Sequence, residues 1–197
     1  MDITIYPRKL QGEINVIPSK SQAHRLLICA AFADRPTVIH CTESNQDIGA
    51  TVACLRALGA QITVTESGFT VFPIQNIPET AELNCHESGS TLRFMLPIVG
   101  ALGVNGTFIM AGRLAERPLS PLWEEMERMG CSLSRPTANT IRCTGKLKKG
   151  KYVIDGGVSS QFITGLMFAH MLMDGCTLTV TGKLESKPYI DLTNAAL

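Results

Sequence analysis

Apolar positions along the chain follow a helical period in some stretches and a strand period in others. Residues 118–129 are predicted to form a helix because Leu119, Leu122 and Met126 recur at helical spacing. Residues 47–58 show a similar pattern, and a glycine follows each of the two stretches, as at many helix ends. Residues after each glycine alternate in character and predict two β-hairpins, with strands over 61–65 and 69–73 and over 131–135 and 140–143. The pattern therefore indicates an α/β (α+β) chain.

The same arrangement recurs about every 70 residues. Small polar residues open an apolar helical stretch, and a tight turn and a strand beginning at threonine follow, in three segments: 19–39, 88–109 and 159–179. The threonines are Thr37, Thr107 and Thr177, at intervals of 70 residues. Each unit reads strand, helix, strand, helix, strand, strand. This regularity predicts a domain with pseudo-threefold βαβαββ repeats.

The last repeat is shorter than the other two. Arg117-Pro118 of the second unit recurs as Lys187-Pro188 in the third, where Pro188 is expected to open a helix. Since no hairpin follows before Leu197, we expect a truncated third unit and a chain that is part of a longer protein. The expected division is a strand or connection toward a second domain over 1–18 and a repeat domain over 19–197, with units over about 19–87, 88–158 and 159–197.

Composition and charge limit the classes of function. The chain is 45% hydrophobic and 18% charged, which is typical of a folded globular protein. A net charge of +1 and the lack of a basic stripe with interleaved aromatic residues argue against a nucleic-acid partner. No apolar run approaches the roughly 20 residues of a membrane span, and the first residues do not resemble a secretion signal. We therefore expect a cytoplasmic protein.

Cysteine and histidine usage does not indicate a metal centre. Seven cysteines are spread along the chain without a C-x-x-C pair, mostly in apolar surroundings, and are interpreted as reduced core residues. The four histidines are scattered rather than clustered. Neither a metal nor a cofactor is expected.

The strongest candidate for chemistry is the helix start at Ser19-Lys20-Ser21, with Arg25 about one turn later. Free backbone N–H groups and the helix dipole make such a terminus attractive to anions. A cation at this end is unfavourable by itself, and a bound anion offsets that cost. We therefore predict a site for a small, phosphorylated, multiply anionic substrate. Two alternatives stay open, namely that the serines are helix caps and that the basic residues form a solvated turn.

A second candidate is the loop over 111–118, where Arg113 and Arg117 together suit a carboxylate. Loops of this composition are common on protein surfaces, so the loop alone is a weak signal. The signature motifs of P-loops, dinucleotide-binding folds and zinc proteases are absent from the sequence.

Five segments in order along nearly the whole chain resemble the EPSP synthases (3-phosphoshikimate 1-carboxyvinyltransferases): PSKSQAHR at 18–25, SGSTLR at 88–93, ERPL at 116–119, DGGVSSQF at 155–162 and SKPYID at 186–191. The resemblance implies one domain of the two-domain enolpyruvyl transferase fold, an inside-out α/β barrel with three βαβαββ units in each domain. It also implies transfer of the carboxyvinyl group of phosphoenolpyruvate to the 5-hydroxyl of shikimate 3-phosphate. The implied reaction proceeds by addition and elimination without a metal at a site between the two domains, and we expect the protein to be a monomer.

The same resemblance assigns roles by position. Lys20 is expected to be catalytic and to contact both substrates. The residues expected to contact shikimate 3-phosphate are Lys20, Ser21, Arg25, Ser159, Ser160, Gln161, Ser186 and Tyr189. Those expected to contact phosphoenolpyruvate are Lys20, Gly89, Arg117 and Gln161.

Two positions depart from the family pattern. Glu87 stands where the family usually has Asn, two residues before Gly89, and Pro18 replaces a common Gly. An acid beside an anion pocket is expected to point away or to pair with a cation such as Arg93 or Arg117. Glyphosate sensitivity therefore does not follow from the resemblance. Because the family's general base lies in the second domain, the chain alone is expected to lack transferase activity.

Two other functions remain as alternatives. A UDP-N-acetylglucosamine enolpyruvyl transferase shares the fold, but that family typically carries a Cys in the loop before its Arg-Pro pair, and residues 111–117 contain none. The other alternative is a non-catalytic anion-binding or assembly module.

Overall fold

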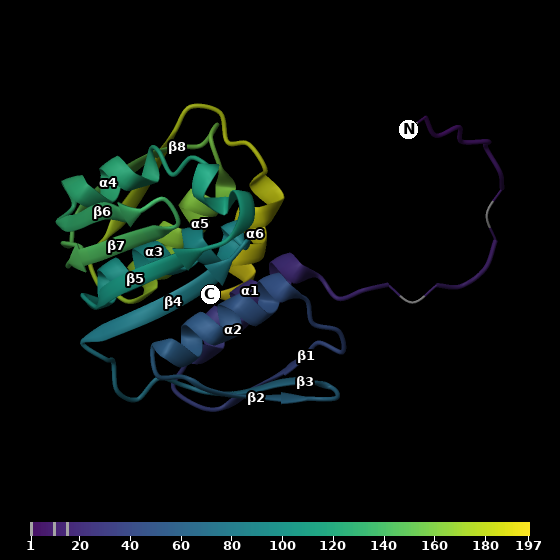
Figure 1. The fold of residues 1–197 in the computed structure, drawn as a ribbon, viewed down its shortest axis with the longest axis horizontal. Coiled ribbons are helices and arrows are strands. Elements are labelled where there is room, and N and C mark those ends of the chain that lie inside the picture. The colour runs from purple at the N-terminus through teal and green to yellow at the C-terminus, as the bar shows by residue number, and fades with distance from the viewer. Residues whose placement is uncertain (1, 10, 15) are drawn as a thin grey trace.

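The computed structural model describes residues 2–9, 11–14 and 16–197 (Figure 1). The helices are α1 (Lys20–Ala31), α2 (Gln46–Ala57), α3 (Gly89–Leu102), α4 (Leu122–Arg128), α5 (Ser160–Met171) and α6 (Lys187–Ala196), with a 3-10 helix η1 (Gly112–Glu116). The strands are β1 (Thr37–His40), β2 (Gln61–Thr65), β3 (Gly68–Phe72), β4 (Thr80–His86), β5 (Asn105–Met110), β6 (Cys131–Thr137), β7 (Thr140–Gly145), β8 (Lys151–Asp155) and β9 (Thr177–Thr181). The predicted helix over 47–58, both hairpins and the helix opened near Pro188 are confirmed.

The sheets repeat the same plan. The first has the strand order β1-β3-β2 and the second the order β4-β5-β7-β6, while the third pairs β8 with β9. The βαβ units β4-α3-β5 and β8-α5-β9 each join parallel strands through a helix. The two hairpins, β2-β3 and β6-β7, are antiparallel and occupy the same place in their sheets. The predicted succession of elements is therefore confirmed in full for the second unit, while the described residues of the first unit show no strand before α1 and the third unit shows β8, α5, β9 and α6.

Helices fill the space between the sheets. In Figure 1 the three sheets lie toward the outside, and α3 and α5 lie between them. The α3 helix carries apolar residues on nearly every side and is buried along most of its length, as expected for a helix surrounded by other elements. Gly165 of α5 lies against the backbone carbonyl of Arg93 in α3, where a Cβ atom would collide with the oxygen. This close approach brings the starts of α3 and α5 together.

The helix predicted over 118–129 begins later than expected. The structure places α4 at Leu122–Arg128, and residues 118–121 form an irregular turn. Arg117 has extended backbone angles (φ −75°, ψ 134°), as expected for a residue that precedes proline. A second proline, Pro121, stands at the position that caps the helix. Helical spacing of apolar residues therefore predicted the buried face correctly, while the two prolines set the true start.

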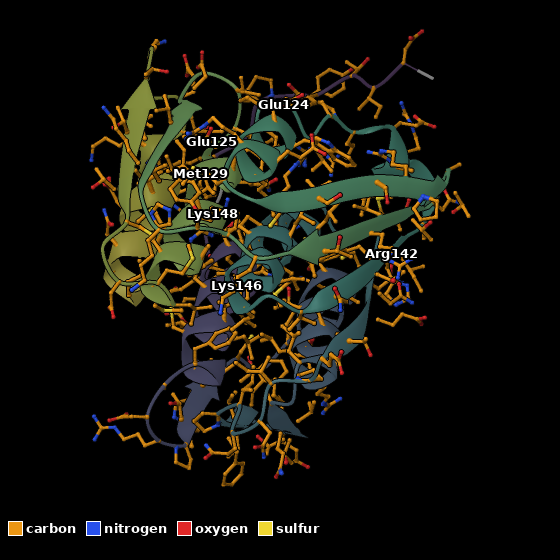
Figure 2. All side chains as sticks on the ribbon, turned by 90° about the vertical axis from the view of Figure 1, so that its left-hand side faces the viewer. Glu124, Glu125, Met129, Arg142, Lys146 and Lys148 are labelled. Carbon is orange, nitrogen blue, oxygen red and sulfur yellow. The ribbon has the colours of Figure 1, made fainter. Side chains whose placement is uncertain are left out.

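Basic residues on one side of the molecule cover the ends of helices. Figure 2 shows Lys146 and Lys148 on the same face as Met129. The methylene groups of Lys146 pack over Gly103, which ends α3, and those of Lys148 pack over Gly130, which follows α4. Cations near helix C-termini are favourable there because of the helix dipole. The lysines on this face are therefore explained by their packing at the ends of α3 and α4.

Two further features bear on the sequence predictions. All seven cysteines are free, and five of them are buried: Cys41, Cys54, Cys85, Cys131 and Cys143. No helix within the described residues combines the length and apolar character that a membrane span requires.

Candidate anion-binding site at three helix starts

A serine caps each of the three helices that open the repeats. The Oγ atom of Ser19 accepts a hydrogen bond from the backbone N–H of Gln22 (3.3 Å), and that of Ser88 accepts one from Thr91 (3.3 Å). Ser159 does the same at the start of α5, where the distance is 3.2 Å. The capping interpretation is thus correct for these three serines. The side chains that follow each capping serine are not needed for capping and are available to bind a ligand.

The starts of α1, α3 and α5 converge on one small pocket of about 230 Å³. Its lining residues are Lys20, Ser21, Arg25, Ser90, Phe94, Ser160, Gln161 and Tyr189. Six of them were expected from the sequence to contact shikimate 3-phosphate, although they come from segments up to 169 residues apart. The pocket therefore collects serine hydroxyls and two cations at the positive ends of three helices.

Arg25 forms the floor of this pocket and is almost fully buried, with 2% of its surface exposed. Its guanidinium donates hydrogen bonds to the hydroxyls of Thr193 (2.8 Å) and Thr164 (3.2 Å). It also donates to the backbone carbonyls of Tyr189 (3.0 Å) and Ser21 (2.7 Å).

All four of these acceptors are neutral, and the described carboxylates form no ion pair with Arg25. Burial lowers the pKa of the guanidinium from its ordinary value. A buried cation without a counter-charge is costly, so an anion in the adjoining pocket would compensate it.

Lys20 stands at the mouth of the pocket and is half exposed. Its Nζ atom lies 2.6 Å from a carboxylate oxygen of Asp47, near the start of α2. The pair is open to solvent on both sides, so it contributes little to stability. An arriving anion can therefore draw Lys20 away from Asp47 at small cost.

A second cationic region adjoins the first at the start of α3. Arg93 donates hydrogen bonds to the side-chain oxygen of Gln161 (2.7 Å) and to the carbonyl of Pro118 (3.1 Å). The Arg117 guanidinium lies so close to Gly89 that a Cβ atom there would be 2.6 Å from its nitrogen. Burial lowers the pKa of Arg93, and the neighbouring charge of Arg117 lowers it further. Two guanidinium groups thus face a helix N-terminus beside the pocket.

Sequence comparison agrees with this geometry. The family model for EPSP synthase (3-phosphoshikimate 1-carboxyvinyltransferase) matches residues 5–197. This chain belongs to the EPSP synthase family.

Relatives and solved structures are consistent with the match. The 3-phosphoshikimate 1-carboxyvinyltransferase of Clostridium beijerinckii is 40% identical over all of this chain and 47% of its own length. That of Clostridium botulinum strain Alaska E43 is 40% identical over 98% of this chain and 46% of its own. The chain thus spans about half the length of the curated relatives it matches.

Solved structures confirm the fold. An EPSP synthase from Acinetobacter baumannii superimposes with a TM-score of 0.75 at 20% identity, covering 93% of this chain and 42% of that one. The enolpyruvyl transferase NikO from Streptomyces tendae gives a TM-score of 0.59 at 16% identity, covering 92% and 42% of the two chains. The expected enolpyruvyl transferase fold is therefore confirmed.

Glu87, which departs from the EPSP synthase pattern, lines a neighbouring cavity of about 630 Å³ together with Arg113 and Arg117. Its side chain packs against Gly112, in a place that a Cβ atom would occupy. It makes no ion pair among the described residues. Arg113 pairs with Glu116 at 3.2 Å on the exposed surface.

Not every residue that the EPSP synthase resemblance assigned lies in the pocket. Ser186 precedes α6 with left-handed backbone angles (φ 56°, ψ 37°) and is exposed, outside the pocket lining. The hydroxyl of Ser159 serves as a helix cap beside the pocket. Gly89 and Arg117 lie at the adjoining cationic region.

The structure also adds residues that sequence reasoning missed. Ser90 lines the pocket and accepts a hydrogen bond from the side-chain amide of Gln161 at 2.9 Å. It stands 69 residues after Ser21 and 70 before Ser160, so the repeat contained the signal that identifies it. Arg93, Phe94 and Asp47 carried no comparable signal.

A buried polar chain joins the helix starts from behind. The Nδ1 atom of His24 lies 2.8 Å from the hydroxyl of Thr51, which lies 2.8 Å from that of Thr91. Thr91 in turn donates to Ser88, the cap of α3, at 2.7 Å. Burial lowers the pKa of His24 to about 4, so the imidazole is neutral near pH 7. This row of hydrogen-bonded side chains fixes α1, α2 and α3 relative to one another.

Proposed function

We propose that this chain forms the shikimate 3-phosphate side of a 3-phosphoshikimate 1-carboxyvinyltransferase. The observation that carries the proposal is Arg25, a buried cation with only neutral partners, at a pocket where three helix N-termini meet. A phosphorylated, multiply anionic substrate supplies the missing negative charge.

The proposed residue roles are those that the family resemblance implies. Shikimate 3-phosphate contacts Lys20, Ser21, Arg25, Ser159, Ser160, Gln161, Ser186 and Tyr189. Phosphoenolpyruvate contacts Lys20, Gly89, Arg117 and Gln161. Lys20 reaches both substrates and is catalytic. For Ser186 this role requires the segment before α6 to turn toward the pocket, because the residue is exposed outside it.

The reaction joins the 5-hydroxyl oxygen of shikimate 3-phosphate to C2 of phosphoenolpyruvate, while the hydroxyl proton passes to a general base and a proton is added at C3. Loss of phosphate and of a C3 proton then restores the double bond. Two anionic substrates repel each other, so fixed cations and helix dipoles must offset that repulsion at the reacting centre. Lys20, Arg25, Arg93 and Arg117 supply such charges on this side.

A facing domain is the second partner in this proposal. It supplies the general base and further phosphoenolpyruvate-binding cations, in a cytoplasmic monomer that works without a metal or cofactor. The 197-residue chain alone therefore binds shikimate 3-phosphate weakly and has no transferase activity. Measurable turnover by the purified chain with both substrates would contradict this part of the proposal.

Titration of the chain with shikimate 3-phosphate, followed by amide NMR shifts, tests the half-site. We expect saturable shifts at Ser21, Arg25 and Ser160, and a loss of affinity of about tenfold or more in Lys20→Met. Lys148→Met is the matched control, because Lys148 packs over Gly130 and lies outside the pocket lining. Absence of shifts at all three amides would refute binding by this chain alone.

Two alternatives predict different results. Saturable binding of UDP-N-acetylglucosamine in place of shikimate 3-phosphate would indicate the related transferase. Equal affinity for shikimate 3-phosphate and inorganic phosphate would indicate a simple anion-binding module.

A further inference from the structure

Gln161 carries an amide that can face a ligand with either of two chemically different ends. Its Oε1 atom accepts hydrogen bonds and its Nε2 atom donates them, and a half-turn of the amide exchanges the two with almost no change in shape. Gln161 lines the pocket at the start of α5. An anion requires the donating end, whereas the accepting end would repel it. The orientation of this amide therefore decides whether Gln161 favours or opposes anion binding.

Arg93 fixes this orientation from the neighbouring helix α3. Its Nη1 atom lies 2.7 Å from Oε1 of Gln161. A guanidinium donates hydrogen bonds and has no acceptor, so only the carbonyl end of the amide can face it. The positive charge also makes this bond stronger than one between neutral groups. The Nε2 atom is thereby directed away from Arg93, and it donates to the hydroxyl of Ser90 at 2.9 Å, within the pocket lining.

Ser90 by itself does not select the orientation of the amide. A serine hydroxyl both donates and accepts, because its hydrogen rotates to suit the neighbouring group. It would bond equally well to Oε1 of a reversed amide. Ser90 takes one of the two Nε2 hydrogens, and Nε2 forms no other hydrogen bond within the part of the chain that the structure describes. The second hydrogen is therefore available to a ligand in the pocket.

Arg93 is itself held by contacts that do not involve Gln161. Its Nη2 atom donates to the carbonyl of Pro118 at 3.1 Å, and its guanidinium carbon lies 5.4 Å from the centre of the Phe162 ring. The backbone carbonyl of Arg93 lies against Gly165, where a Cβ atom would not fit. These contacts fix the arginine from α5 and from the turn before α4. The arginine therefore positions the glutamine, rather than the reverse.

A purely structural role does not explain why an arginine stands here. The Nε atom of Arg93 is buried without a partner among the described residues. Burial lowers the pKa of this guanidinium, and the neighbouring charge of Arg117 lowers it further. Methionine would fill a similar space and pack on Phe162 without these penalties. Methionine would not, however, direct the amide of Gln161.

We propose that Arg93 is a positioning residue, which holds the donating end of Gln161 toward the pocket and so makes the pocket selective for an anion. The inference rests on the proposed function for the identity of the ligand, shikimate 3-phosphate. The family resemblance assigned substrate contacts to Gln161 and none to Arg93. In this role Arg93 acts through Gln161 and needs no contact with the ligand.

NOEs from the side-chain amide protons of Gln161 measure the orientation in the 197-residue chain without a ligand. In the wild type we expect NOEs to the Hβ protons of Ser90. In Arg93→Met the side chain still packs on Phe162, but both orientations and further rotamers of Gln161 become allowed. We therefore expect the NOEs to Ser90 to weaken at least about twofold, since the amide protons then spend half of the time or less beside Ser90.

A double-mutant cycle tests whether the orientation serves binding. Gln161→Ala should weaken shikimate 3-phosphate binding about tenfold, the value of one hydrogen bond to a charged group, in a titration followed by the Ser21 amide. In the Arg93→Met background the same change should cost less than about threefold, because ordering the freed glutamine side chain offsets most of the value of its bond.

The matched control for the lost charge is Arg142→Met. Arg142 lies exposed on β7, outside the pocket lining, and is labelled in Figure 2. In the Arg142→Met background we expect Gln161→Ala to keep its effect of about tenfold, because the amide of Gln161 is still held by Arg93.

Three results would overturn the proposal: wild-type amide protons of Gln161 without NOEs to Ser90, wild-type NOEs in Arg93→Met, and an undiminished effect of Gln161→Ala in the Arg93→Met background. The first of these does not depend on the folding of any variant. A wild-type chain that does not bind shikimate 3-phosphate would instead contradict the proposed function, and the ligand-free NOEs would then decide the orientation by themselves.

Discussion

Replacing His24 by asparagine should reduce the loss of folding stability that the protein shows between pH 7 and pH 5. His24 is 1% exposed, packs edge-on against Phe94 and contacts Thr51 through Nδ1. Its Nε2 atom is buried without a partner among the described residues. Burial, reinforced by the charges of Lys20 and Arg25 and partly offset by Asp47, lowers the pKa of His24 from 6.5 to about 4.

The sign of the effect follows from the two protonation states. Between pH 4 and 6.5 the unfolded chain binds a proton at this histidine and the folded protein does not. The free energy of unfolding therefore falls as the pH falls through this window. The full shift corresponds to about 3 kcal/mol, of which about 2 kcal/mol is lost between pH 7 and pH 5.

Urea unfolding of the wild type and His24→Asn at pH 5, 6 and 7, followed by the fluorescence of Trp123, measures the difference. Asparagine can keep a hydrogen bond to Thr51 and does not titrate. We expect the stability of the variant to change about 2 kcal/mol less between pH 7 and pH 5 than that of the wild type. Burial also lowers the pKa of His170, but that residue contributes equally to both proteins. Identical pH dependence in the two proteins would refute the assignment of a neutral, buried His24.

Two further substitutions test the site and the core. Gly89→Ala places a Cβ atom against the Arg117 guanidinium. Under the proposed function, this substitution should weaken phosphoenolpyruvate binding about tenfold in a calorimetric titration, which is the value of one charge-assisted hydrogen bond. The control is Gly49→Ala, in open space within α2, which should instead raise the free energy of unfolding by about 0.5–1 kcal/mol. Glu125→Gln should lower the free energy of unfolding by about 1–3 kcal/mol, because the buried carboxylate accepts bonds from Arg128 and from the backbone of Val153. Its exposed neighbour Glu124, seen beside it in Figure 2, should tolerate Gln within about 0.5 kcal/mol, and equal losses for the two would contradict the burial argument.

The sequence by itself determined the repeat, most of the order of the elements and the residue types that gather at the helix starts. Apolar spacing, glycines at helix ends and serines at helix starts act within a few residues, so they can be read directly from the chain. The repeat made Ser21 and Ser160 equivalent and contained the signal for Ser90. Local patterns failed at residues 118–121, where Pro121 delays a helix whose buried face was otherwise predicted correctly.

Only the tertiary structure decided which of these groups meet. Arg25 bonds to Thr164 and Thr193, and no local pattern indicates that side chains so distant in the sequence surround it. The pocket exists because Gly165 lets α5 approach α3 closely enough to bring Gln161 onto Ser90. Long-range packing of this kind depends on the shapes of whole elements, whereas sequence spacing reports only the neighbours along one helix or strand.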